Sequence, residues 1–180
     1  VNNYKIGYIY IICTLLLYVY SSYLKKIPLA GNLVISTLTG FIFVLLMLFE
    51  VAFLNTISFE GARYALDILL WQVKFYGGVA FITNLAREIV KDLEDRKADE
   101  AHHVNTFAVQ FGETAGKALA ILVLTTLVAG ISFFMKSFWE VNAIKEFSYL
   151  ALMVVAPSII CSALLVFAKS SQEYAKVSLL

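Results

Sequence analysis

Four acidic side chains recur at helical spacing within one short stretch of this 180-residue chain. If residues 84–100 form a helix, each side chain is turned by about 100° from the one before, so residues three, four and seven apart share a face. Four carboxylates and one amide then fall within an arc of about 80°. The carboxylates, here called the acidic stripe, belong to Glu88, Asp92, Asp95 and Asp99, and the amide to Asn84. The apolar residues Ile89, Val90 and Leu93 lie away from the stripe, which makes the helix amphipathic.

The stacked carboxylates of the acidic stripe repel one another, at a cost of about 0.2–0.5 kcal/mol for each pair four residues apart. A hard divalent cation would relieve this repulsion, and Mg²⁺ commonly takes one or two protein carboxylates together with a substrate phosphate. We therefore expect the acidic stripe to supply metal ligands. A solvated charged helix with fortuitous stacking gives the same pattern, and spacing alone does not separate the two interpretations.

The composition indicates a membrane protein. Hydrophobic residues make up 61% of the chain and charged residues 15%, and the mean hydropathy is +0.81. A soluble domain carries about 45–50% apolar and about 25% charged residues. A chain of this length cannot bury so much apolar surface, so the excess must face lipid. The composition also excludes a disordered chain, and the net charge of +1 excludes an ordinary nucleic-acid-binding protein.

The apolar residues fall into five runs, each close to the roughly 20 residues that a helix needs to cross a bilayer. We expect membrane helices at Ile6–Leu24, Ile27–Phe49, Tyr64–Leu85, Ala118–Met135 and Phe147–Ala168. Pro157 should kink the last of these helices, and Gly77-Gly78 should allow close packing of the third. The predicted fold class is therefore an all-α polytopic membrane protein with an additional amphipathic acidic helix outside the bilayer.

Positive charge is distributed unequally between the two sides of these spans. The segments that follow the first, third and fifth spans hold Lys25, Lys26, Arg87, Lys91, Arg96, Lys97, Lys117, Lys169 and Lys176. The opposite side holds Lys5, Arg63, Lys136 and Lys145. Because cytoplasmic loops carry the excess of Lys and Arg, we expect the loop 86–117 to be cytoplasmic. The expected location is the bacterial inner (plasma) membrane.

The acidic stripe is also part of a longer motif. Residues 87–99 read R-E-I-V-K-D-L-E-D-R-K-A-D. This stretch resembles the second aspartate-rich motif of the UbiA-type intramembrane prenyltransferases. The pattern R-E-x-x-K-D-x-x-D-x-x-x-D resembles the branch of geranylgeranylglycerol-phosphate geranylgeranyltransferases and 4-hydroxybenzoate polyprenyltransferase-like proteins. Two further stretches are similar to segments of the family. Residues 23–32 are similar to its Y-x-L-K-x-x-P-L-x-G-N segment, and residues 105–112 are similar to its T-L-P-I-x-x-G stretch, with Phe-Ala where the family has Leu-Pro.

The resemblance implies a bundle of nine helices around a central cavity, with one aspartate-rich motif in each of two cytoplasmic loops. The five spans would be helices four to eight of a single transmembrane domain, which residues 1–180 hold only in part. The family's first motif, N-x-x-x-D-x-x-x-D, has no separate copy in this sequence. We therefore expect an internal piece of a longer enzyme, inactive by itself.

The resemblance also implies an activity, which is the Mg²⁺-dependent transfer of an isoprenyl group from a prenyl diphosphate to a lipid-soluble or aromatic acceptor within the bilayer. Nucleic acid has no part in it. The catalytic residues would be Arg87, Lys91, Asp92 and Asp95. Substrate would be bound by Lys25, Lys26, Asn32 and Asn84, and Mg²⁺ by Glu88, Asp92, Asp95 and Asp99.

A non-enzymatic membrane protein is the competing interpretation. In a transporter or a cation-binding assembly factor, the acidic stripe would be an entry point for ions. A transporter is expected to hold its charged groups near the bilayer midplane or in broken helices. The acidic residues here follow the end of the third span, at the membrane surface, which favours the enzyme.

Overall fold

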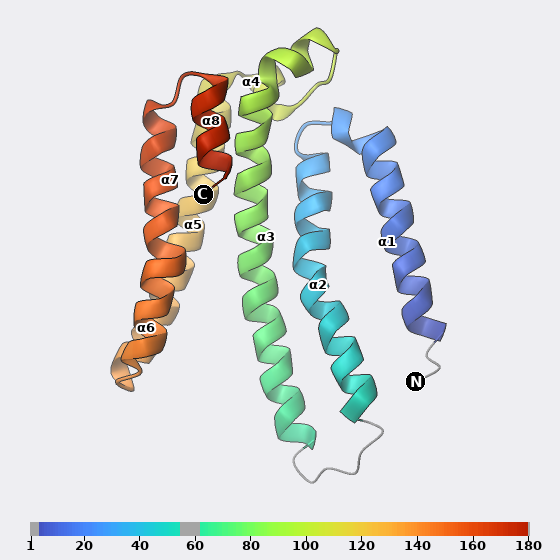
Figure 1. The fold of residues 1–180 in the computed structure, drawn as a ribbon, viewed down its shortest axis with the longest axis vertical. Coiled ribbons are helices and arrows are strands. Elements are labelled where there is room, and N and C mark those ends of the chain that lie inside the picture. Colours follow the sequence, from blue (N-terminus) through green and yellow to red (C-terminus); the bar gives the residue numbers. More distant parts are fainter. Residues whose placement is uncertain (1–3, 55–61, 180) are drawn as a thin grey trace.

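A computed structural model describes residues 4–54 and 62–179, and the regular structure within these ranges is entirely helical. Four long helices run side by side: α1 (Tyr4–Ser22), α2 (Ala30–Leu54), α3 (Ala62–Ala101) and α5 (Glu113–Glu140) (Figure 1). A fifth column consists of α6 (Ile144–Leu150), a π-helical turn η2 (Ala151–Val155) and α7 (Ala156–Phe167). The short elements are the 3₁₀ turn η1 (Leu24–Lys26), α4 (Phe107–Phe111) and α8 (Ser171–Ser178).

Four helical segments are long and apolar enough to cross a membrane, among the residues that the structure describes. They are Ala30–Val51, Tyr64–Ala101, Glu113–Glu140 and Ile144–Phe167. The apolar part of α1, Gly7–Ser22, is shorter, so the first of the five predicted crossings stays a prediction. Large apolar side chains are widely exposed on these helices, as Phe133 (83% exposed) and Phe167 (77%) illustrate. The chain is therefore an integral membrane protein, and the predicted all-α polytopic class is confirmed.

The acidic stripe lies on α3 itself, whereas the sequence suggested a membrane helix ending at Leu85 and a separate acidic helix. At 1.5 Å per residue the 40 residues of α3 span about 60 Å, twice the hydrocarbon thickness of a bilayer. Residues 62–101 contain no proline, and the side chains opposite the stripe are buried by other helices. Nothing therefore interrupts the helix after Leu85, and the stripe is carried on a continuous extension of α3.

Two glycines set the distance between α2 and α3. A Cβ atom at Gly40 would lie 2.8 Å from the carbonyl oxygen of Gly77, and one at Gly77 would lie 3.1 Å from the carbonyl oxygen of Gly40. Any side chain at this crossing would push the two helices apart. A Cβ atom at Gly78 would meet nothing within 4 Å. Of the predicted Gly77-Gly78 pair, Gly77 is thus the residue that permits the close approach.

The helix that contains Pro157 changes geometry where a kink was predicted. The π-helical turn η2 (Ala151–Val155) comes directly before α7, so that Pro157 lies in the first turn of α7. Proline has no N–H and its ring clashes with the carbonyl group four residues earlier. A π-helical turn is one of the few places where a helix can absorb such a defect.

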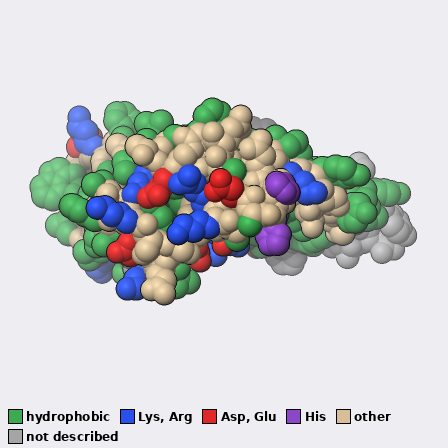
Figure 2. Space-filling model, turned by 90° about the horizontal axis from the view of Figure 1, so that it is seen from above, with side chains coloured by type: hydrophobic (Ala, Val, Ile, Leu, Met, Phe, Trp, Pro, Cys, Tyr) green, Lys and Arg blue, Asp and Glu red, His purple; other side chains and the backbone are tan. Residues whose placement is uncertain are grey.

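One end of the bundle is rich in charged side chains, and we call it the charged end. The segments that follow α1, α3 and α7 all lie at this end, at the top of Figure 1. Figure 2 looks down on it and shows Lys, Arg, Asp, Glu and His side chains grouped in the middle of the surface, with hydrophobic side chains around them. The structure thus gathers the predicted basic segments on one side of the bundle.

The C-terminal helix α8 was not anticipated from the sequence. It begins with a capping box, in which Ser170 Oγ accepts a hydrogen bond from the Glu173 N–H (3.4 Å) and Glu173 Oε2 accepts one from the Ser170 N–H (2.9 Å). The Ser-x-x-Glu spacing predicts such a helix start. Tyr174 and Val177 are buried, and α8 packs on α3 and α7 at the charged end.

Candidate functional site

The acidic stripe lines a small cavity of about 50 Å³ at the charged end. The end of α1, the turn η1, the start of α2 and the extension of α3 form its walls. Its lining residues are Tyr20, Lys25, Gly31, Asn32, Glu88, Lys91, Asp92, Asp95 and Asp99. Four carboxylates, two lysines and one amide therefore share a confined polar space, which we call the acidic cavity.

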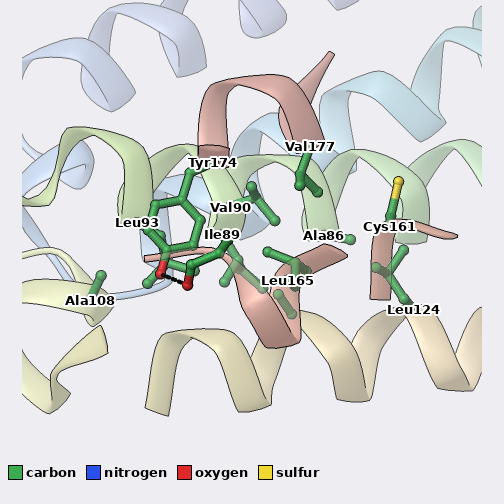
Figure 3. Close-up of a cluster of buried hydrophobic side chains, with 12 residues drawn as sticks. Ala86, Ile89, Val90, Leu93, Ala108, Leu124, Cys161, Leu165, Tyr174 and Val177 are labelled. Carbon is green, nitrogen blue, oxygen red and sulfur yellow. Dashed lines mark hydrogen bonds between the residues drawn. The ribbon is translucent and has the colours of Figure 1, made fainter. Parts of the chain in front are cut away.

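The rotation of α3 about its axis directs the stripe into this cavity. Ala86, Ile89, Val90 and Leu93 are each 4% exposed or less and pack against side chains of α5, α7 and α8 (Figure 3). Since these apolar residues and the stripe are on different faces of one helix, burying the first directs the second toward α2.

Asn32 connects α2 to the stripe. Its side chain is 8% exposed, and its Nδ2 donates a hydrogen bond to Asp92 Oδ2 (2.9 Å). Ser36 Oγ is fully buried and donates to the Asn32 carbonyl (2.6 Å), while Asn84 Nδ2 donates to Ser36 Oγ (3.4 Å). This chain of hydrogen bonds between α2 and α3 fixes the position of the Asp92 carboxylate.

The cavity has an excess of negative charge. Asp92 lies about 10 Å beyond Leu85, the last residue of the predicted span, and so outside the apolar part of α3. Burial raises the pKa of the Asp92 carboxyl from 3.8 to about 6, in opposition to the hydrogen bond from Asn32, and the other stripe carboxylates raise it further. The pKa of Asp99 is also raised, first by burial and then by Asp95. A cation in this cavity would lower the pKa of both carboxyl groups again, because it stabilises their charged form.

The donor chemistry of the cavity fits Mg²⁺ together with a phosphate group. Carboxylate and amide oxygens are the ligands that Mg²⁺ prefers, and it often keeps only one or two protein carboxylates. Within residues 4–54 and 62–179, no three acidic, His or Cys side chains are grouped closely enough to hold a metal ion by themselves. A phosphate group would supply the remaining oxygen ligands of such an ion.

Three of the predicted site residues do not line the acidic cavity. Arg87 lines a separate cavity of about 390 Å³ between α3, α7 and α8, and its Nη1 atom is 3.5 Å from Glu88 Oε1. Asn84 contacts Ser36, and Lys26 is exposed on η1. The structure brings together the others, which are Lys25, Asn32, Glu88, Lys91, Asp92, Asp95 and Asp99.

Sequence reasoning assigned no role to three residues of this region. Ser36 follows Asn32 by four positions, and this spacing could have placed both on one face of α2. Gly31 gives η1 and α1 room, because a Cβ atom there would lie 3.1 Å from the Tyr20 ring and 3.2 Å from the Leu24 carbonyl oxygen. Tyr20 carried no signal of its own, as one of ten tyrosines in an apolar chain.

These features define a polytopic helical membrane protein with a carboxylate-lined cavity at one membrane face. Comparison with known proteins identifies the family. The model of the UbiA prenyltransferase family matches residues 1–179, and the chain belongs to this family. The predicted resemblance is thereby confirmed.

Several curated proteins are similar in sequence, and those described here carry the name digeranylgeranylglyceryl phosphate synthase. The protein of Methanosphaera stadtmanae is 28% identical over 170 residues, which are 93% of this chain and 54% of the relative. The protein of Methanopyrus kandleri is 38% identical over 120 residues, 63% of this chain and 38% of the relative. That of Thermococcus kodakarensis is 28% identical over 169 residues, 92% and 51% respectively.

Two of these relatives match along most of this chain, and the chain spans about half of their length. No solved structure gave a significant match.

Proposed function

We propose that this chain is part of an intramembrane prenyltransferase, which transfers an isoprenyl group from a prenyl diphosphate to a lipid-like acceptor. The observation that carries the proposal is the acidic cavity, where four carboxylates and two lysines meet at the edge of a membrane bundle. A prenyl diphosphate also combines a charged and an apolar part. Its diphosphate head requires metal and cationic partners, while its prenyl tail requires an apolar environment. Membership of the UbiA family supports the same activity.

The reaction is a substitution at the first carbon of the prenyl chain. The bond between this carbon and the diphosphate oxygen breaks, and its electron pair leaves with the diphosphate. A nucleophilic atom of the acceptor forms the new bond to the carbon and loses a proton. The leaving group accumulates negative charge in the transition state, so its stabilisation is the main task of the protein.

Each residue of the cavity has a part in this task. Asp92, held by Asn32, and the rest of the acidic stripe would bind Mg²⁺, which when bound neutralises diphosphate oxygens as a Lewis acid. Lys25 and Lys91 line the same cavity and would donate charge-assisted hydrogen bonds to phosphate oxygens. The apolar spans beside the cavity would accommodate the prenyl tail.

The names of the relatives point to a particular kind of acceptor. Each is called a digeranylgeranylglyceryl phosphate synthase. By analogy we favour a geranylgeranyl donor and an acceptor that carries a glyceryl phosphate group over an aromatic acceptor. We further propose that the charged end faces the cytoplasm. The relatives described above come from archaea, so the bacterial membrane expected from the sequence stays a prediction.

A transfer assay tests this function. The full-length protein, purified in lipid nanodiscs, is incubated with radiolabelled geranylgeranyl diphosphate and Mg²⁺, with either geranylgeranylglyceryl phosphate or 4-hydroxybenzoate as acceptor. We expect labelled lipid product with the first acceptor and none when EDTA replaces Mg²⁺. Product with 4-hydroxybenzoate alone would revise the acceptor class. No product with either acceptor would favour the non-enzymatic interpretation.

A further inference from the structure

Helix α8 packs behind the acidic part of α3, on the side away from the acidic cavity. Its Tyr174 (2% exposed) and Val177 (6%) belong to one buried cluster with Ile89, Val90 and Leu93 of α3 (Figure 3). The Tyr174 hydroxyl reaches past these side chains to the carbonyl oxygen of Ala168 (3.1 Å), the bond drawn as a dashed line in Figure 3. Helix α8 thus packs on α3 through apolar contacts, while the Tyr174 hydroxyl connects α8 to the end of α7.

The same hydroxyl also contacts Glu113, the first residue of α5. Tyr174 Oη is 2.6 Å from Glu113 Oε1, as expected for a hydroxyl that donates to a carboxylate. Lys117 Nζ lies 3.1 Å from the same oxygen and 5.5 Å from the centre of the Tyr174 ring. Lys117 also donates to the Ala168 carbonyl. Glu113, Lys117 and Tyr174 therefore join α5, α8 and the end of α7 at one point.

This group extends to the acidic stripe through Arg96. Arg96 Nη1 is 3.7 Å from Glu113 Oε2, and its Nε is buried with no hydrogen-bond partner in the described part of the chain. Arg96 directly follows Asp95 and precedes Asp99 by three residues. A further contact joins α3 to α8, since Ser178 Oγ lies 3.2 Å from Glu94 Oε2 and 3.0 Å from the carbonyl oxygen of Ala175. An isolated exposed ion pair contributes little to stability, but here it belongs to a network anchored by a buried tyrosine.

We infer that α8 is a positioning element, in which Tyr174 acts through Glu113 and Arg96 to hold the acidic stripe toward Asn32 and Lys25. This inference rests on the proposed function, because it concerns how well the stripe receives Mg²⁺ and diphosphate. Tyr174 lies outside the acidic cavity and has no contact with its lining residues among the contacts described, so its effect on the substrate is indirect.

The test compares Tyr174→Phe with the wild type in the full-length protein. Phenylalanine keeps the buried ring and removes only the hydroxyl. We expect the concentrations of Mg²⁺ and prenyl diphosphate needed for half-maximal rate to rise about three- to tenfold, as is typical of residues that act through others. The rate at saturation should stay within about twofold of the wild type, since the cavity residues are unchanged. Tyr64→Phe, at the exposed opposite end of α3, is the matched control and should change neither.

A second measurement does not depend on catalysis. Amide hydrogen exchange over residues 92–101 should be faster in Tyr174→Phe, and unchanged in Tyr64→Phe, because the extension of α3 loses its anchor. If Tyr174→Phe does not fold, Ser178→Ala removes the contact to Glu94 and should give the same two effects more weakly.

The outcomes separate this inference from the proposed function. A variant that loses saturated rate or thermal stability with unchanged half-saturation would show that α8 has only a structural role, and would overturn the inference. Unchanged amide hydrogen exchange over residues 92–101 in Tyr174→Phe would also overturn the inference. If Asp92→Asn alters the Mg²⁺ dependence while Tyr174→Phe does not, the proposed function stands and this inference fails. No Mg²⁺-dependent transfer by the wild type would overturn both.

Discussion

The two ends of the bundle contain cavities of opposite character. The acidic cavity of about 50 Å³ at the charged end is held by hydrogen bonds such as the one from Asn32 to Asp92. At the other end, a cavity of about 660 Å³ opens between α3, α5 and α6, and we call it the aromatic cavity. Its lining residues are Ile68, Trp71, Gln72, Phe75, Tyr76, Phe134, Phe138, Lys145, Glu146, Tyr149 and Leu150.

The aromatic cavity is organised by ring contacts. The ring of Phe134 has its centre 5.0 Å from that of Trp71, 4.8 Å from that of Phe75 and 5.0 Å from that of Phe138. Its only charged lining residues are Lys145 and Glu146, among those that the structure describes. The larger cavity therefore suits lipid or packing, and the smaller one suits ionic chemistry. The larger cavity is therefore at the end opposite to the one proposed for the chemistry.

The comparison also shows how one helix serves two environments. Trp71 and Phe75 on α3 line the aromatic cavity, while the acidic stripe further along α3 lines the acidic cavity. By helical spacing, Trp71 and Phe75 project more than about 90° away from the direction of Glu88. The helix thus presents rings in its apolar part on one face and carboxylates in its polar part on another.

The largest expected contrast between the two ends is in their accessibility. With Cys13 and Cys161 replaced by Ala, Ala101→Cys marks the charged end and Val141→Cys the aromatic end. If the charged end is cytoplasmic, an impermeant thiol reagent added to intact cells should label the second and spare the first, because positive loops stay inside. Permeabilised cells should show labelling at both sites. The reverse labelling pattern in intact cells would show that the charged end faces the outside of the cell.

The next contrast concerns catalysis. The double variant Asp92→Asn, Asp95→Asn should lower prenyl transfer by about 10²–10³-fold or more, because it removes charge that stabilises the transition state. Glu146→Gln, which makes the same kind of change in the aromatic cavity, should stay within about twofold. Rates are measured at saturating Mg²⁺ and prenyl diphosphate. Equal losses in the two variants would contradict the assignment of chemistry to the charged end.

A smaller effect distinguishes two neighbouring cations at the charged end. Lys91 lines the acidic cavity, whereas Arg87 lines the cavity behind α3. Lys91→Gln should reduce kcat/KM about 10- to 100-fold, the equivalent of one lost hydrogen bond to a charged group, and Arg87→Gln less than about threefold. A larger loss for Arg87→Gln would mean that it reaches the substrate, as the family motif implies. Steady-state kinetics on both variants decide between the two.

The smallest expected effect is on stability, at the crossing of α2 and α3 between the two ends. Gly40→Ala should lower the free energy of unfolding by about 1–3 kcal/mol, because its Cβ would collide with the Gly77 carbonyl. Gly78→Ala has open space and should be neutral or stabilising by up to about 1 kcal/mol through helix propensity. Thermal unfolding in one detergent measures both. If the two variants behave alike, the close crossing is not a determinant of stability.

Much of this protein could be predicted from patterns that depend only on neighbours along the chain. The apolar runs predicted the helices, since a bilayer admits few other ways to satisfy backbone groups. The three- and four-residue spacing of the carboxylates placed the acidic stripe on one face, because a helix turns by a constant angle. The family resemblance rests on the same local motifs, and the UbiA match agrees with it.

Only the tertiary structure decided which residues share the acidic cavity. Asn32 and Asp92 are sixty positions apart, and Tyr174 and Glu113 sixty-one. Lys25 and Lys26 are neighbours in sequence, yet Lys25 lines the cavity and Lys26 does not. Arg87 belongs to the family motif but faces away from most of it. Such outcomes depend on how each helix is rotated against its partners, and that rotation is set by the packing of several helices together rather than by the pattern of any one.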